Sequence, residues 1–189
     1  MKPTIRAIET EFLGERFRSR LEAKWARVFH ALNIPFTFEP EGFELEEDGQ
    51  VSRYLPDFWL STFGAWVEIK PESPSERERK LARLLHQGHG APVLVVCGVP
   101  GKHFIQAYVN GASHGELGFL FECQFCHVIE VFYLVAPYSD DEWMSVSHLC
   151  QCGNASPLST PRLHRAYAEA TGCRFERLPK NMRRALGAV

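Results

Sequence analysis

Long hydrophobic runs, an excess of positive charge and repeated segments are all missing from this sequence. No stretch approaches the ~20 apolar residues that span a bilayer, and the charged N-terminus lacks the continuous apolar core of a signal peptide. We therefore expect a cytoplasmic protein with no membrane partner. Because the formal net charge is −2, contact with nucleic acid would depend on local basic patches or on a metal that bridges carboxylates to phosphate.

The chain is long enough and apolar enough for one domain with a real core. It has 189 residues, 45% of them hydrophobic, which argues against disorder. Apolar residues at spacings of three and four predict an amphipathic helix over 15–32. The other predicted elements are strands over 36–45, 54–60 and 65–70, a helix from a capping box at 73–76 to Gly88 or Gly90, a buried strand over 92–97, strands over 104–109, 117–122 and 128–135, and a helix over 161–171. The first part has the order αβββαβ, which indicates an α/β (α+β) fold.

Two of the predicted strands carry acidic residues beside a lysine. Pro56-Asp57 lies in the strand 54–60, and Glu68-Ile69-Lys70 lies in the strand 65–70. Facing side chains of adjacent antiparallel strands lie ~5 Å apart, close enough for Asp57 and Glu68 to share one magnesium ion. The two-residue period puts Lys70 on the same face as Glu68, where it could orient a metal-bound water or help to remove its proton. The alternative is an ordinary polar face that binds no ion.

Glu22 is a further candidate for the site, and Glu72, His86 and His89 are secondary candidates. Glu22 flanks the apolar stripe of the first helix, so its carboxylate is expected at the border of the core. The alternative for Glu22 is an exposed carboxylate paired with a neighbouring arginine. Glu72 follows a proline that breaks the strand, and a surface role is expected for it. His86 and His89 lie at the end of the second helix and are assigned to solvent or to local packing.

Two close pairs of cysteines follow the predicted core. Their members are Cys123, Cys126, Cys150 and Cys152. Four thiolates from two such turns suit a tetrahedral, structural zinc ion, in which His127 or His148 could replace one cysteine. Reduced, unpaired cysteines are the alternative, and a redox CxxC is disfavoured because no thioredoxin-like βαβ unit surrounds it. Cys97 and Cys173 are expected to be packing cysteines.

These motifs together resemble those of the PD-(D/E)XK nuclease superfamily, whose restriction-endonuclease-like core has the same αβββαβ order. The resemblance covers residues 15–98 and rests on 17–26, 54–58 and 67–70, which are similar to segments of small nucleases common in bacteriophages and mobile elements. It implies that Asp57 and Glu68 bind magnesium or manganese, that Lys70 is the catalytic lysine, and that Glu22 is the additional acid, also a metal ligand, that some members use. Some members hold an iron–sulfur cluster with four cysteines, one of which precedes the nuclease motifs. Both pairs follow the motifs here, which favours zinc.

We expect three regions: a nuclease core over 1–100, a β-rich zinc-binding insertion over 101–160, and a C-terminal helix with a basic tail over 161–189 that packs on the core. The expected activity is that of a metal-dependent DNA endonuclease or nickase, with in-line attack of a metal-activated water on a backbone phosphate. DNA as the substrate, rather than RNA, and the cytoplasm of a phage host as the location follow from the family alone. A homodimer, or a protein partner bound through the cysteine insertion, stays open. The alternatives are a catalytically silent nuclease-fold binding module and a zinc-ribbon adaptor within a phage or mobile-element nucleoprotein complex.

Overall fold

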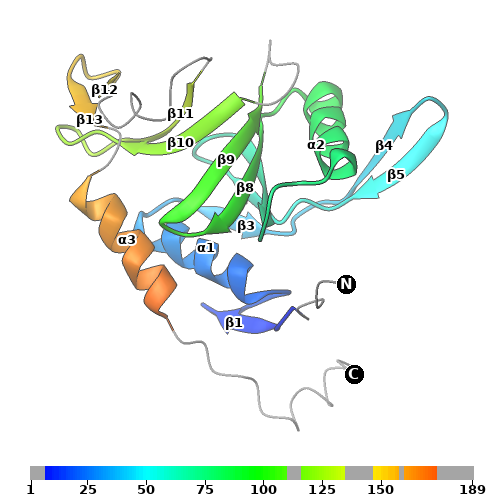
Figure 1. Ribbon diagram of the computed structural model, residues 1–189, viewed down its shortest axis with the longest axis horizontal. Helices are drawn as coiled ribbons and strands as arrows, with labels where there is room; N and C mark the ends of the chain where they lie inside the picture. Colours follow the sequence, from blue (N-terminus) through cyan, green and yellow to red (C-terminus); the bar gives the residue numbers. More distant parts are fainter. Residues whose placement is uncertain (1–6, 110–115, 135–146, 158–159, 174–189) are drawn as a thin grey trace, which may run out of the picture.

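The computed structural model describes residues 7–109, 116–134, 147–157 and 160–173. In these ranges the chain forms a mixed α/β structure with three helices and a seven-stranded sheet (Figure 1). Within the same ranges, no helix is both long enough and apolar enough to cross a membrane. The basic tail predicted after the last helix lies outside the described residues.

The large sheet has the strand order β11-β10-β9-β8-β7-β6-β3. The helices are α1 (Arg20–Ala31), α2 (Glu76–His89) and α3 (Pro161–Gly172). The strands of the large sheet are β3 (Phe36–Phe38), β6 (Phe58–Leu60), β7 (Ala65–Lys70), β8 (Val93–Val99), β9 (Lys102–Tyr108), β10 (Glu116–Glu122) and β11 (Ile129–Leu134). Three hairpins complete the described part: β1 (Thr10–Phe12) with β2 (Glu15–Phe17), β4 (Phe43–Glu47) with β5 (Gln50–Tyr54), and β12 (Ser147–Leu149) with β13 (Ala155–Pro157).

The pairing of β7 with β8 organises the sheet. These two strands are parallel, whereas the other pairs of the large sheet are antiparallel. A parallel pair needs a crossover connection, and α2 supplies it. The elements α1, β3, β6, β7, α2 and β8 therefore follow the predicted αβββαβ order, with the β4–β5 hairpin inserted after β3. The β-rich segment after residue 100 begins as part of the same sheet, because β9 pairs with β8 along its whole length.

Strand β8 shows how the sheet separates two apolar layers. Leu94 and Val96 are buried with residues of α1 and α3, whereas Val95 and Cys97 are buried with residues of α2. Figure 1 shows α1 and α3 together on one side of the sheet and α2 on the other. Burial on both faces confirms the prediction from the continuous apolar run, since each alternate side chain needs an apolar neighbour.

The predicted start of the first helix is wrong. The helix begins at Arg20 and not at residue 15, because Glu15–Phe17 pairs with Thr10–Phe12 as a hairpin. Ser19 is the N-cap, and its side chain and that of Glu22 form a reciprocal capping box. The amphipathic pattern predicts the helix correctly from Arg20 onward. It also included Phe17, a buried residue of β2, because the position of Phe17 happens to fit the helical period.

Two further boundaries differ from the prediction because the chain makes a hairpin between β3 and β6. The predicted strand over 36–45 is divided into β3 and β4, and Tyr54 ends β5 instead of opening the strand with Asp57.

The second helix also starts later than predicted. Its N-cap is Ser75, which forms a capping box with Glu78, and Gly88 lies within the helix while Gly90 ends it in the left-handed conformation, with φ of 73°.

Candidate functional site

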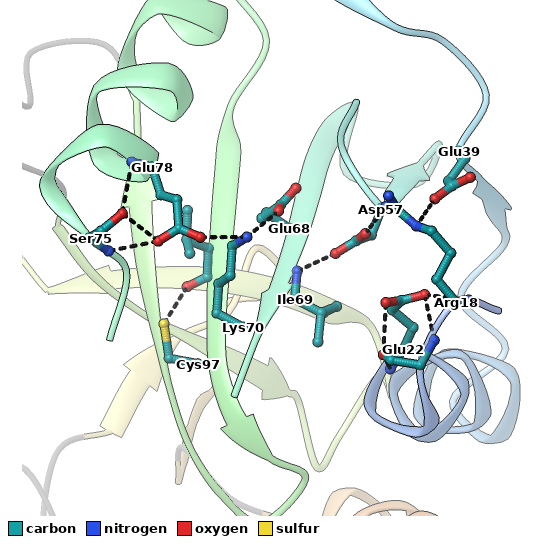
Figure 2. Close-up of polar contacts among 12 residues, drawn as sticks. Arg18, Glu22, Glu39, Asp57, Glu68, Ile69, Lys70, Ser75, Glu78 and Cys97 are labelled. Carbon is teal, nitrogen blue, oxygen red and sulfur yellow. Dashed lines mark hydrogen bonds and ion pairs between the residues drawn. The ribbon is translucent and has the colours of Figure 1, made fainter. Parts of the chain in front are cut away.

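Asp57 and Glu68 lie opposite each other, with Asp57 directly before β6 and Glu68 within β7. The antiparallel register pairs Phe58 with Val67, so the next residues along both strands are Asp57 and Glu68. Both carboxylates are buried, with exposed fractions of 3% and 8%. Figure 2 shows them side by side between two basic residues, Arg18 and Lys70. The structure thus brings together the acidic and basic residues that the two short motifs single out.

Both oxygens of Asp57 accept hydrogen bonds. Oδ2 accepts from the backbone N–H of Ile69 at 2.7 Å, which fixes the carboxylate against β7. Oδ1 accepts from Nη2 of Arg18 at 2.9 Å. Arg18 also forms an ion pair with Glu39 through Nε, so one guanidinium connects two acids from different parts of the chain (Figure 2).

Glu68 contacts Lys70 through one oxygen, and a hydrogen bond with the hydroxyl of Tyr54 also acts to lower the pKa of Glu68. Its Oε1 lies 2.8 Å from Nζ of Lys70, and the same ammonium lies 2.7 Å from Oε1 of Glu78. The other oxygen, Oε2, is buried and has no hydrogen-bond partner among the described residues. A buried acceptor without a donor is costly unless an ion or a water satisfies it. The arrangement therefore leaves one carboxylate oxygen free for a ligand beside Asp57.

The electrostatics of the site follow from burial and from the closeness of two acids. Burial and then the charge of Glu68 raise the pKa of Asp57 well above its usual range, against the opposing effect of the Ile69 N–H and Arg18. Burial also raises the pKa of Glu68, although Lys70 opposes it. A pair of buried carboxylates that repel each other in this way gains stability from a bound cation or a proton.

Lys70 is held as an ammonium ion. Burial acts to lower its pKa, but the contacts with Glu68 and Glu78 outweigh burial, and the pKa of Lys70 lies above its ordinary value. In Glu78, partial burial is likewise outweighed by hydrogen bonds from Lys70 and Ser75, which lower the pKa to about 2. Lys70 can therefore donate hydrogen bonds and stabilise negative charge in this state, but it carries no free lone pair with which to accept a proton.

The structure brings two of the three predicted acids together, whereas Glu22 has other partners. Glu22 is buried, with an exposed fraction of 8%. Its Oε1 accepts from the Ser19 hydroxyl at 2.7 Å, and its Oε2 accepts from the N–H groups of Arg18 and Ser19 at 2.9 and 3.3 Å. Within the described ranges, ligand atoms of Glu22, Asp57 and Glu68 do not all approach within 4.8 Å of one another. Two carboxylates plus water and phosphate suffice for magnesium, which seldom has an all-protein cage.

Sequence reasoning missed the partners of these residues. Arg18, Glu39 and Glu78 are not among the site residues predicted from the sequence. Glu78 carries a usable signal, because Ser75-x-x-Glu78 is itself a capping box pattern close behind Lys70. Arg18 and Glu39 carry no local signal, since they meet Asp57 only through the fold.

The two histidines among the secondary candidates make local contacts around α2. His86 is buried, with Nδ1 2.9 Å from the carbonyl oxygen of Ala91. The ring of His89 packs on that of Phe43 at 4.6 Å between centroids. Both histidines thus serve local packing, as predicted. Glu72 is exposed on the loop before α2.

The four cysteines of the two close pairs form one cluster. The sulfur atoms of Cys123, Cys126, Cys150 and Cys152 all lie within 4.8 Å of one another. The Sγ–Sγ distances are 3.7 Å for Cys123–Cys152 and 3.5 Å for Cys126–Cys150. Sulfur atoms at the corners of a tetrahedron with Zn–S bonds of ~2.3 Å lie about 3.8 Å apart. The cluster is therefore compatible with a structural metal such as zinc.

Tight turns give the cysteines this geometry. The N–H of His127 donates to the carbonyl oxygen of Cys123 at 2.9 Å, and the N–H of Gly153 donates to that of Cys150 at 2.8 Å. A hydrogen bond from the side chain of Asn154 lowers the pKa of Cys152 to about 6, which favours its thiolate. In Cys126 and Cys150, backbone hydrogen bonds are outweighed by desolvation and by contacts with the other sulfur atoms, which raise the pKa of both thiols. His127 is not part of the cluster among the described residues, and the side chain of His148 lies outside them.

A buried carboxylate connects the cysteine cluster to the rest of the protein. Glu122 directly precedes Cys123 and is 1% exposed. It accepts from the hydroxyl of Thr160, the N-cap of α3, and from Nη1 of Arg162 at 2.9 Å. Arg162 also donates from Nη2 to the carbonyl oxygen of Leu32, just after α1, at 2.9 Å. The cysteine turn, α3 and α1 are thus held by one polar network.

The other two described cysteines lie apart from the cluster. Cys97 is buried in β8, where burial raises the pKa of its thiol to about 11. Cys173 ends α3 and is half-buried.

Comparison of the chain with models of protein families, with curated proteins and with solved structures finds no match.

Proposed function

We propose that this protein is a metal-dependent deoxyribonuclease of the PD-(D/E)XK type, with Asp57 and Glu68 as ligands of magnesium or manganese. The observation that carries the proposal is the free, buried Oε2 of Glu68 beside the carboxylate of Asp57. The order of α1, β3, β6, β7, α2 and β8 supports it, because that order is the one expected of the superfamily core. A divalent ion at this position would supply Lewis acidity for hydrolysis of a phosphodiester bond.

The residues of the site have separate tasks in this proposal. Asp57 and Glu68 hold the cation, and the Ile69 N–H keeps the Asp57 carboxylate oriented toward it. Lys70 orients the attacking water and stabilises the charge that develops on the phosphate, since its raised pKa keeps it protonated. Glu78 positions Lys70 through the contact at 2.7 Å. Glu22 caps α1 and thereby fixes the backbone of Arg18, while its proposed role as a metal ligand would require it to exchange these hydrogen bonds.

We propose that the cysteine cluster holds zinc with a structural role. Four thiolates leave no open position for a substrate. The Glu122 network makes the cluster a support for α3 and for the end of α1. It is therefore assigned to stability of the fold and not to the chemistry of cleavage.

The test is cleavage of supercoiled, linear, single-stranded and branched DNA with magnesium or manganese. Asp57→Ala and Lys70→Ala should abolish cleavage, and the absence of divalent metal should do the same. Matched controls are Glu44→Gln and Lys102→Ala, which change an exposed carboxylate and an exposed ammonium on other strands. The proposal fails if the intact protein cleaves none of these DNAs, or if cleavage survives both site substitutions.

A binding module is the second candidate, and two features of the cysteine turn favour it. Phe125 and Val128 expose 56% and 47% of their surface beside Cys126, which suits contact with a macromolecule. If cleavage is absent, protein that holds zinc but shows no affinity for magnesium would support a zinc-ribbon adaptor or a silent nuclease-fold module. Zinc content by mass spectrometry and magnesium titration followed by thermal unfolding distinguish these outcomes from the nuclease.

A further inference from the structure

We infer that Arg18 binds the scissile phosphate of the substrate, an inference that rests on the proposed nuclease function. Arg18 lies outside the Asp57, Glu68 and Lys70 positions that suggested the function. Its backbone precedes the N-cap of α1, and its guanidinium reaches the carboxylate of Asp57 (Figure 2). An arginine that contacts a metal ligand lies within reach of a phosphate oxygen bound to the same metal.

Two of the three nitrogen atoms of the Arg18 guanidinium have acidic partners. Nη2 donates to Asp57 at 2.9 Å and Nε pairs with Glu39, so the plane of the group is fixed by two acids. Nη1 has no hydrogen-bond partner among the described residues. The side chain of Arg18 is 54% exposed, whereas that of Asp57 is 4% exposed. The free end of the guanidinium therefore faces solvent beside a buried acid, and a fixed fork with free N–H donors is well suited to a phosphate.

The charges around the site explain why this contact should depend on the metal. The carboxylates of Asp57, Glu68, Glu39 and Glu78 outnumber the two cations, Arg18 and Lys70, among the groups in direct contact. When all are ionised the cluster has two excess negative charges, which repel a phosphate. A divalent cation on Asp57 and Glu68 cancels that excess, so the attraction of Arg18 for phosphate is no longer opposed.

The alternative is that Arg18 only balances the charge of Asp57. In that case Arg18 acts on the metal site and has no contact with the substrate. The two roles predict different responses of DNA binding and of metal binding to the same substitution. A structural partner of Asp57 would alter metal affinity, whereas a phosphate ligand would alter DNA affinity and its dependence on salt.

The test is equilibrium binding of a fluorescein-labelled DNA duplex, measured by anisotropy with calcium in place of magnesium to suppress cleavage. Arg18→Gln should weaken binding about 10-fold or more and reduce the slope of log K against log salt by about 1. Arg18→Lys, which keeps the charge but not the fork, should fall between it and the wild type. Arg20→Gln is the matched control, because Arg20 is exposed two residues further on at the start of α1. Without calcium, the wild type and Arg18→Gln should bind with similar low affinity.

Magnesium binding is measured in parallel from the shift in thermal unfolding. Arg18→Gln should keep this shift, because Asp57 and Glu68 are intact. DNA affinity and salt slope equal to those of the wild type would overturn the role of Arg18 while leaving the nuclease proposal in place. Loss of the magnesium shift together with DNA affinity would also overturn it, since Arg18 would then act through Asp57. A wild-type protein that binds no DNA with calcium would refute both proposals.

Discussion

The Asp57–Glu68 pair makes a quantitative prediction about the effect of magnesium on stability. A ligand that binds only the folded state adds RT ln(1 + [L]/Kd) to the free energy of unfolding. At a magnesium concentration ten times Kd this contribution is about 1.4 kcal/mol. For a chain of this size it corresponds to a rise in melting temperature of ~3–6 °C.

Glu68→Gln should remove the magnesium effect without harming the fold. Glutamine has nearly the same volume as glutamate, and Lys70 keeps its contact with Glu78 at 2.7 Å. Because burial raises the pKa of Glu68, the charge costs free energy in the metal-free protein. Its removal should therefore leave the melting temperature unchanged, or raise it by an amount equivalent to up to about 1 kcal/mol.

The measurement is thermal unfolding of wild type, Glu68→Gln and the surface control Glu44→Gln over a magnesium titration. The wild type and Glu44→Gln should show the same rise, and Glu68→Gln should show none. The reasoning is refuted if magnesium does not shift the wild type, or if Glu68→Gln responds as the wild type does. A lower melting temperature of metal-free Glu68→Gln would contradict the expected cost of the buried charge.

Three further predictions concern the cysteine cluster, the Glu122 network and the half-buried His103. Cys150→Ser should lose zinc and unfold at lower temperature, whereas Cys97→Ser should keep an equimolar amount of zinc, as measured by mass spectrometry. Arg162→Ala should destabilise the protein by about 2 kcal/mol in urea, because Glu122 stays buried with one partner fewer, and the same substitution should cost less in a Glu122→Gln background. Burial lowers the pKa of His103 from 6.5 to about 4. The unfolded chain therefore takes up this proton at a higher pH than the folded protein does, and the free energy of unfolding decreases as pH falls from about 6.5 toward about 4. His103→Phe should reduce that loss of stability in urea titrations at several pH values, and an unchanged slope would contradict it.

The elements with strong local signals were predictable from the amino-acid sequence. The apolar run of β8 requires burial on both faces, and β7, α2 and α3 were expected close to their observed positions. The two cysteine pairs also led to the cluster that the structure contains. In each case the signal lies in the spacing of a few neighbouring residues, which local geometry turns directly into a strand, a helix or a turn.

Tertiary structure decided what lies around the short motifs. Arg18 and Asp57 are 39 residues apart in sequence and Glu122 and Arg162 are 40 apart, so no local pattern could pair them. The first helix starts at Arg20 because a hairpin with Thr10–Phe12 takes up the residues before it. The sequence by itself determined which residue types could hold a metal and which segments could be buried. Only the fold decided that Arg18 contacts Asp57 and that one oxygen of Glu68 is left without a hydrogen-bond donor, because both depend on how distant parts of the chain pack together.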